Sequence, residues 1–155
     1  MTTDVRSKLL SVIGNPAWVA FTWLGMTAGI SLLATPLRFT AETMTRPVAL
    51  DVGRVVFAAL NKAELLALVI MLIIVRTTGQ ARNYWMPVFA LALILIAQGA
   101  WLIPELGART DLVIAGIEPE PSIAHGVYST LELLKLLLLG WLGFRSLGDL
   151  SEATR

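Results

Sequence analysis

The sequence contains no cysteine and a single histidine, His125. The absence of cysteine excludes disulfides, thiolate catalysis, iron–sulfur ligation and zinc sites built on cysteine. One histidine with no nucleophile motif near it cannot form a Ser-His-Asp triad, and no glycine-rich phosphate loop is present. We therefore expect no catalytic residues, no enzyme activity and no metal site, and the sequence identifies no cofactor.

Charged residues are also scarce. They make up 15% of the chain, against 56% hydrophobic residues, and the mean hydropathy is +0.74. Soluble domains usually carry about 25% charged residues, so this composition indicates a membrane protein. The formal net charge of +1 gives no electrostatic basis for binding nucleic acid. A length of 155 residues suits a single domain covering residues 1–155.

Long apolar runs are what the sequence has in abundance. Each approaches the roughly 20 residues that a helix needs to cross a bilayer, and in lipid such spans must be helical to satisfy their backbone polar groups. We therefore predict an all-α integral membrane protein, a bundle of four transmembrane helices. The first run is interpreted as a retained span rather than a cleaved signal peptide, because its apolar part is long and no clean cleavage site follows it. The predicted spans are 17–36, 53–75, 84–103 and 123–144.

Short connections join these spans. Pro36, Pro104 and Pro121 fall at or just beyond the predicted span ends, where a missing N–H is tolerated, so we expect the helices to end there. The connections are residues 37–52, 76–83 and 104–122.

The distribution of basic residues predicts the orientation. One side of the membrane would hold both termini and the 76–83 connection, and it carries more basic residues than the other side. This bias places both termini in the cytoplasm, and in a bacterium the membrane would be the cytoplasmic (inner) membrane. Four tryptophans near predicted span ends fit an aromatic belt at the interfaces: Trp18, Trp85, Trp101 and Trp141. The basic residues on the cytoplasmic side are Arg6, Lys8, Arg76, Arg82, Arg145 and Arg155, against Arg38, Arg46, Arg54 and Arg109 on the other.

Two glycines in the first span are spaced for helix packing. Gly25 and Gly29 form a small-xxx-small pattern, at which the backbone of another helix can approach closely. The pattern does not decide whether that helix belongs to the same chain or to a second copy. A single chain of this length leaves little room for a transport pathway, so we expect a homo-oligomer or a subunit of a membrane complex.

The second span carries charges near its middle, in the stretch NKAELL at 61–66. A charge at a helix centre costs about 2.5–3.5 kcal/mol on the insertion scale, so Lys62 and Glu64 make this helix marginal by itself. The two residues are two apart and cannot neutralise each other within the helix. Arg54 and Asn61 point in one direction, which lies between the directions of Lys62 and Glu64. These four residues therefore predict a wide polar face on the second span.

The fourth span offers a complement. His125, Tyr128, Glu132 and Lys135 are spaced by three, four and three residues and form one stripe. Counted from the outer ends of the second and fourth spans, Lys62 lies at the depth of Glu132, and Glu64 lies one residue from the depth of Lys135. We therefore predict two salt bridges, Lys62–Glu132 and Glu64–Lys135, within an intramembrane polar network.

Part of the chain resembles a known group. The first span closes on Ala-Thr-Pro at 34–36, and Asp-Val-Gly-Arg at 51–54 begins the next helix, followed by Phe57. This pattern resembles small four-span bacterial membrane proteins of unknown function, distantly similar to the transmembrane protein 205-like domain. The resemblance covers mainly residues 25–70 and implies a four-helix membrane domain without assigned chemistry.

Several functions remain open at this point. Intramembrane ionisable residues mark ion or proton pathways by default, which favours proton- or ion-linked transport. The same residues could instead be buried bridges that only fix the helix register. Two further alternatives are an accessory subunit, whose charges would pair with a partner, and a lipid- or quinone-binding module. The partners that the sequence itself implies are the lipid bilayer and other membrane subunits.

Overall fold

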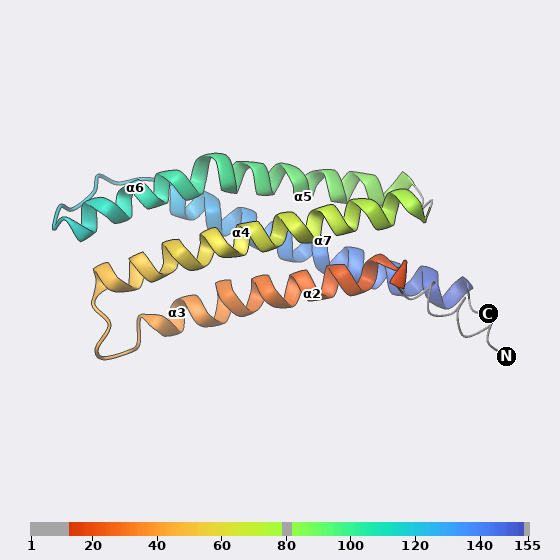
Figure 1. Cartoon of the computed structure of the whole chain (residues 1–155), viewed down its shortest axis with the longest axis horizontal. Coiled ribbons are helices and arrows are strands. Elements are labelled where there is room, and N and C mark those ends of the chain that lie inside the picture. The colour runs from red at the N-terminus through yellow and green to blue at the C-terminus, as the bar shows by residue number, and fades with distance from the viewer. Residues whose placement is uncertain (1–12, 79–81, 154–155) are drawn as a thin grey trace.

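The structure is a computed structural model that describes residues 13–78 and 82–153, and it confirms the predicted bundle of four long apolar helices (Figure 1). Each of the four is long and apolar enough to cross a membrane. Two of them are built from consecutive segments. The elements in chain order are α2 (Pro16–Ala28), η1 (Gly29–Ala34), α3 (Thr35–Arg38), α4 (Arg46–Thr77), η2 (Arg82–Tyr84), α5 (Trp85–Ala97), η3 (Gln98–Leu102), α6 (Ile103–Ile114) and α7 (Ala124–Ala153).

The helices are longer than the apolar runs that predicted them. α4 begins at Arg46, with Pro47 in its first turn, so part of the predicted 37–52 connection is helical. In the same way α6 continues the third span to Ile114, deep into the predicted 104–122 connection. Hydropathy marks the part of a helix that lies in hydrocarbon, whereas the helix itself can continue into water.

Two prolines do not end their helices, contrary to the prediction. Pro36 lies inside α3, which directly follows the π-helical segment η1. Pro104 lies inside α6, which directly follows the π-helical segment η3. Proline lacks an N–H and its ring clashes with the carbonyl four residues earlier. The residue before each proline bonds five residues back, Thr35 N–H to Ile30 O and Ile103 N–H to Gln98 O, which widens the turn that receives the ring.

The two ends of the bundle differ. At one end, here the terminal end, α2 begins, α4 ends, η2 begins and α7 finishes (Figure 1). Asn15 Nδ2 donates to the carbonyl of Ser146 at 2.9 Å there, and the hydroxyl of Tyr84 donates to Asp149 Oδ2 at 2.5 Å. The opposite end, here the loop end, holds the connections 39–45 and 115–123. Arg6, Lys8 and Arg155, which support part of the orientation prediction, lie outside the described residues.

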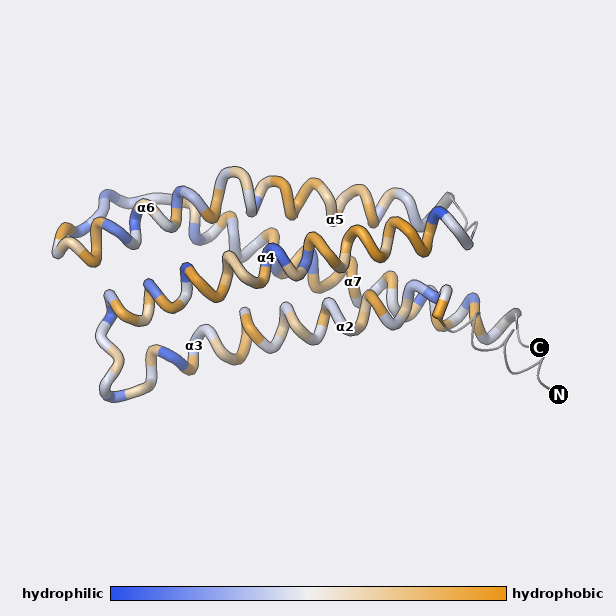
Figure 2. The backbone as a smooth tube through the Cα atoms, in the orientation of Figure 1, coloured by the Kyte–Doolittle hydropathy of each residue, from blue (hydrophilic) through white to orange (hydrophobic). Residues whose placement is uncertain are grey.

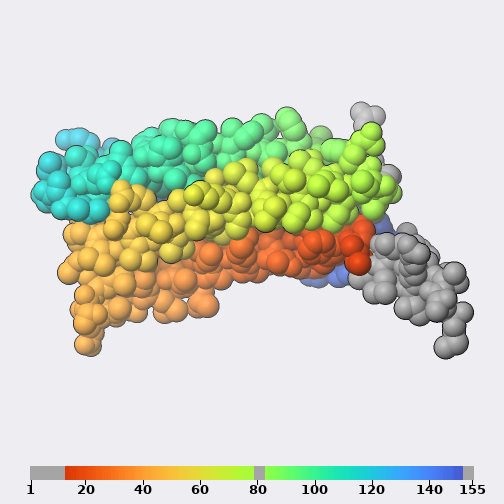
Figure 3. Space-filling view, in the orientation of Figure 1, coloured from red at the N-terminus to blue at the C-terminus, as the bar shows by residue number. Residues whose placement is uncertain are grey.

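The main apolar core fills the terminal half of the bundle. It includes Trp23, Met71, Leu91 and Leu142, each at most 1% exposed. The loop half has a smaller buried cluster, Leu102, Ala124 and Tyr128, and none of the described residues 29–38 in η1 and α3 is buried. Figure 3 shows α2, α4 and the α5–α6 helix side by side on one face. In Figure 2 the tube of α4 changes from apolar to polar near its middle and back again.

Candidate functional site

The ammonium group of Lys135 lies at the centre of a buried polar network. Its side chain on α7 is 0% exposed. Nζ lies 2.6 Å from Glu64 Oε1 on α4 and 2.9 Å from Glu132 Oε2, one turn earlier on α7. It also donates to Gln98 Oε1 at 2.9 Å. An ammonium has three donors, and these three oxygens use all of them.

Glu64 is held by two donors from the first span in addition to the lysine. Trp23 Nε1 donates to Glu64 Oε1 at 3.0 Å, and Thr27 Oγ1 donates to the same oxygen at 2.8 Å. The other oxygen, Glu64 Oε2, is buried and has no hydrogen-bond partner among the described residues. A buried carboxylate oxygen without a partner is costly, because it gives up water and receives nothing in return.

Glu132 is held from both sides. Ser31 Oγ donates to Glu132 Oε1 at 2.5 Å, and Gln98 Nε2 donates to Glu132 Oε2 at 2.8 Å. Gln98 thus uses its amide nitrogen for Glu132 and its amide oxygen for Lys135. All four helices of the bundle therefore contribute a side chain to one connected network.

The π-helical segments supply two of those side chains. Ser31 lies in η1 and Gln98 is the first residue of η3. A π turn changes the direction in which the following side chains point, and such turns are frequent at functional sites. Each of these segments is followed by a helix with a proline at its second position, so Ser31 and Gln98 both lie at irregular turns that precede a proline.

The ionisable groups of the network do not balance. Two carboxyl groups, Glu64 and Glu132, share the single ammonium of Lys135. With all three ionised, the site carries one excess negative charge. Trp23, Thr27, Ser31 and Gln98 donate hydrogen bonds but no formal charge. One proton or one monovalent cation would make the site neutral.

The structure confirms one predicted salt bridge and contradicts the other. Glu64 and Lys135 pair as predicted. Lys62 does not pair with Glu132, which binds Lys135 instead, and the Lys62 side chain is exposed on the outside of α4. The reason is direction around the helix: at about 100° per residue, Lys62 and Glu64 point about 160° apart, so only one of them can face α7.

Two other residues of the predicted network lie beside it. Tyr128 is buried one turn before Glu132, and its ring meets Phe57 edge to face at 5.4 Å between centroids. Asn61 lies one turn before Glu64 and packs against Gly99, where an added Cβ would be 2.9 Å from Asn61 Oδ1. Asn61 Nδ2 is buried without a hydrogen-bond partner in the described chain.

Arg54 and His125 lie outside the network, contrary to the prediction. Arg54 forms ion pairs at 2.5 Å with Asp51 and with Asp111, toward the loop end. The side chain of His125 is exposed near the start of α7, and its backbone carbonyl accepts a hydrogen bond from the hydroxyl of Ser129. Both residues have the right spacing along their helices, but they lie too near the helix ends to reach Lys135.

The two packing glycines of the first span face outward. Gly25 and Gly29 are exposed, and a Cβ added at either would meet no described atom within 4 Å. They therefore do not mediate the close approach of α2 to α7, which occurs at Gly143, beside the ring of Phe21. Whether a second copy packs on Gly25 and Gly29 stays a prediction.

Three network residues, all on the first span, were not predicted, and a sequence signal exists for them. Trp23, Thr27 and Ser31 recur every four residues and form a polar stripe on the first span. Of the five tryptophans in the sequence, Trp23 is also the one that lies away from the predicted span ends. An indole N–H within hydrocarbon needs an acceptor, so this position points to a buried carboxylate on a neighbouring helix.

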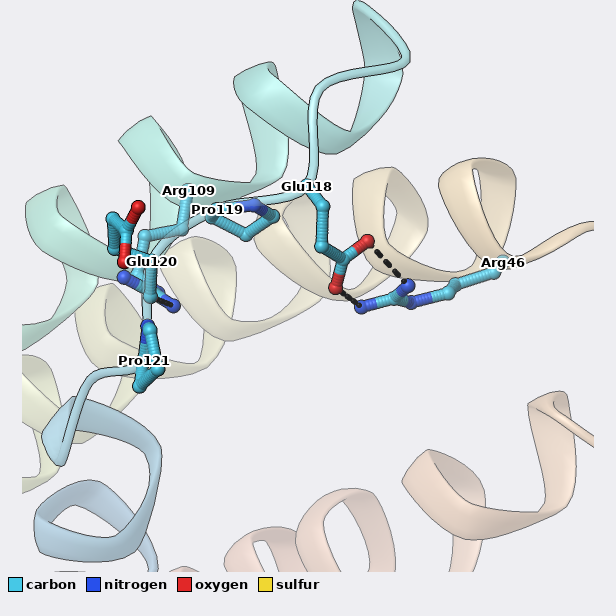
Figure 4. Close-up of a pocket in the computed structure, with 6 residues that line it drawn as sticks. All are labelled: Arg46, Arg109, Glu118, Pro119, Glu120 and Pro121. Atoms are coloured by element: carbon cyan, nitrogen blue, oxygen red, sulfur yellow. Dashed lines mark hydrogen bonds and ion pairs between the residues drawn. The ribbon is translucent and has the colours of Figure 1, made fainter.

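A second polar feature lies at the loop end. A cavity of about 520 Å³ is lined by Arg46, Arg109 and residues 118–121 (Figure 4). The guanidinium of Arg46 forms a bidentate salt bridge with the carboxylate of Glu118, with N···O distances of 3.1 and 3.2 Å. Arg109 donates to the backbone carbonyl of Glu120. Both basic side chains thus hold the 115–123 connection in place. No cluster of three or more His, Asp or Glu residues suited to a metal occurs in the part of the chain that the structure describes.

Comparison with known proteins finds no matching family model, no matching curated protein and no matching solved structure. The resemblance drawn from residues 25–70 therefore stays a prediction.

Proposed function

We propose that the network of Glu64, Glu132 and Lys135 is the ion-binding site of a proton- or cation-linked membrane transport protein. The observation that carries the proposal is the charge imbalance in a fully buried site: two carboxyl groups around one ammonium, with Glu64 Oε2 left without a partner in the described chain. A proton or a monovalent cation on this site would remove its excess charge.

A purely structural role would favour a different composition. Buried ion pairs rarely add net stability compared with well-packed apolar side chains, and an unbalanced set adds still less. A register device needs one acid and one base, whereas this site holds a second acid and extra donors from all four helices. Intramembrane ionisable groups that face the bundle interior are typical of ion and proton pathways.

The packing around the site supports exchange with the loop end. Toward the terminal end the network meets the main apolar core, which includes Met71, Leu91 and Leu142. Toward the loop end the buried cluster is smaller and contains Leu102, Ala124 and Tyr128, while η1 and α3 have no buried residue. Entry from the loop end therefore has fewer buried side chains to displace than entry through the main apolar core, so we expect a proton or cation to reach Glu132 and Glu64 from the loop end.

The test is flux in liposomes that contain the purified protein and a trapped pH-sensitive dye. Wild-type protein should dissipate an imposed pH gradient faster than protein-free liposomes do. Glu64→Gln removes the excess charge without changing the shape of the side chain, and it should reduce the protein-dependent flux at least tenfold. The same measurement with a Na⁺ gradient and a Na⁺ indicator distinguishes a cation from a proton.

The matched control is Glu118→Gln, because Glu118 is a carboxylate at the loop end with 75% of its side chain exposed. Its flux should equal that of the wild type. If wild-type liposomes show no flux above the protein-free background with either ion, the transport proposal is wrong. Equal flux in Glu64→Gln and wild type would equally remove the network from the pathway.

A further inference from the structure

The outward face of α4 carries a lone charge in an apolar seam. Lys62 is exposed, and so are the residues that precede and follow it on the same face, which are separated alternately by four and three residues. Val55 is 63% exposed, Leu66 62%, and Ile73 56%. The full seam is Val48, Val52, Val55, Ala59, Lys62, Leu66, Val69 and Ile73.

The spacing of this seam matches a surface that packs against another helix. Alternating steps of four and three residues are the a/d pattern of two interlocking helices, and a single lysine at such a position fixes register and partner at a cost in stability. A face that touches only lipid can share the apolar composition. Lys62 distinguishes the two cases, because lipid hydrocarbon offers nothing to a lysine ammonium.

The position of Lys62 along α4 is unfavourable for reaching the membrane surface. The apolar stretch runs between Arg54 and Arg76, and Lys62 lies eight residues from Arg54, which is about 12 Å along the helix. The four-carbon stem of lysine covers about half of that distance. Within the described chain, Lys62 has no ion pair.

A second copy of this chain would not supply the missing counter-charge. Glu64 and Glu132 are the carboxylates nearest to Lys62 in depth, and both are buried and bound to Lys135. The exposed carboxylates of residues 13–78 and 82–153 belong to the helix ends and loops, such as Asp111 and Glu118. The complement of the seam is therefore a different chain.

We propose that the α4 seam binds a transmembrane helix of another protein that carries an aspartate or glutamate at the depth of Lys62. Small and β-branched side chains on either side of Lys62 allow close packing, and the paired charge fixes the register. This interface is separate from the buried network, because Lys62 and Glu64 point in nearly opposite directions from α4. It does not depend on whether the network moves ions.

A lipid-soluble carbodiimide tests the proposal in native membranes. This reagent converts a carboxyl group within hydrocarbon to an O-acylisourea. The neutral amine of a contacting lysine then displaces the substituted urea, which leaves an amide with no added atoms. We expect an amide between Lys62 and an Asp or Glu inside an apolar segment of a different polypeptide, located by peptide mass spectrometry. Both Lys62→Leu and Lys62→Arg should abolish this amide. Lys62→Arg keeps the positive charge, so the other polypeptide should still co-purify with it in mild detergent.

The chain contains its own controls. Lys135 lies 2.6 Å from Glu64, so the intramolecular amide between them reports that the reagent reached the bilayer. Lys8→Arg should leave the intermolecular product unchanged. The proposal is overturned if Lys62 forms an amide with a second copy of this chain. It is also overturned if Lys62 forms no amide with another polypeptide in a sample where the Lys135–Glu64 amide forms. Labelling of Lys62 by a membrane-impermeant amine reagent would also overturn it, since that places the ammonium at the headgroups.

A stability measurement gives a second, independent readout. In the purified protein without partners, Lys62→Leu should raise the thermal unfolding midpoint, because it removes an unpaired charge from a surface covered by detergent or lipid. A lower midpoint would mean that Lys62 has an internal partner, which contradicts the proposed interface.

Discussion

Lys135 Nζ and Glu64 Oε1 are 2.6 Å apart, and both side chains are fully withdrawn from the surface of the bundle. This contact joins α7 to α4 in the interior of the bundle. Around it, the second carboxyl group of Glu132 turns an ordinary pair into a triad with an odd charge. The consequences of that odd charge can be measured.

Removing the base should be much more harmful than removing one acid. Lys135→Met leaves two buried carboxyl groups without a counter-charge, and breaking a buried pair in this way costs about 3–5 kcal/mol of unfolding free energy. Glu64→Gln leaves one acid and one base, so we expect it to change stability by about 1 kcal/mol or less. Unfolding of both variants in the same detergent gives the comparison. Equal losses of unfolding free energy in the two variants would show that the excess negative charge does not determine the stability of the site.

The network should be accessible from the loop end only. The natural chain has no cysteine, so a single substitution can be labelled without background. Ser31→Cys, in the loosely packed η1, should react with a small thiol reagent added from the loop end. Leu91→Cys, in the apolar core at 0% exposure, should react at least tenfold more slowly from either side. Equal rates at the two positions would contradict one-sided access.

Two kinds of glycine should respond differently to alanine. At Gly143 an added Cβ would lie 2.6–2.9 Å from the ring atoms of Phe21, so Gly143→Ala should cost about 1–3 kcal/mol through overpacking. At Gly25 and Gly29 the space is open, so alanine should leave the isolated protomer as stable as before. Bulkier Gly25→Ile and Gly29→Ile variants then test the predicted homo-oligomer by mass measurement in detergent: a change of mass supports it, and an unchanged mass removes these glycines from any interface.

The terminal end should lose stability at high pH. Burial, followed by the hydrogen bond to Asp149, raises the pKa of Tyr84 above its ordinary value of about 10. The folded state then keeps this proton at a pH where the unfolded chain has lost it. Stability from Tyr84 is therefore fully present below about pH 10 and falls as the pH rises further. Thermal unfolding between pH 8 and 11 should show a shallower decline for Tyr84→Phe than for the wild type.

The four spans could be predicted because a bilayer demands about 20 apolar residues and little else. The Glu64–Lys135 pair followed from depth alone, since both residues lie at nearly the same distance from the loop end. Depth says nothing about direction around a helix, and this is why Lys62 was wrongly paired with Glu132. The stripe of Trp23, Thr27 and Ser31 was readable from its spacing of four and was missed because these side chains carry no charge.

The helix continuity at the prolines was harder to predict. Pro36 and Pro104 both have the properties of a stop signal, and the sequence gives no local sign that a π turn precedes them. Ser31 and Gln98 lie within those turns. A site built partly on irregular helical geometry can be located by depth, but its complete set of contacts requires the tertiary structure.

A π turn holds one residue more than the α-helical turn it replaces. η1 and η3 can therefore be regarded as single-residue insertions that the helices absorb as a bulge. Deleting one residue within Gln98–Leu102 would return the helix to regular geometry and preserve the facing of its two flanking halves, whereas a deletion within α4 would rotate half of that helix by about 100°. In the first and third spans one residue can therefore be lost without turning the flanking halves, although the turn that would be lost is the one that receives the proline ring.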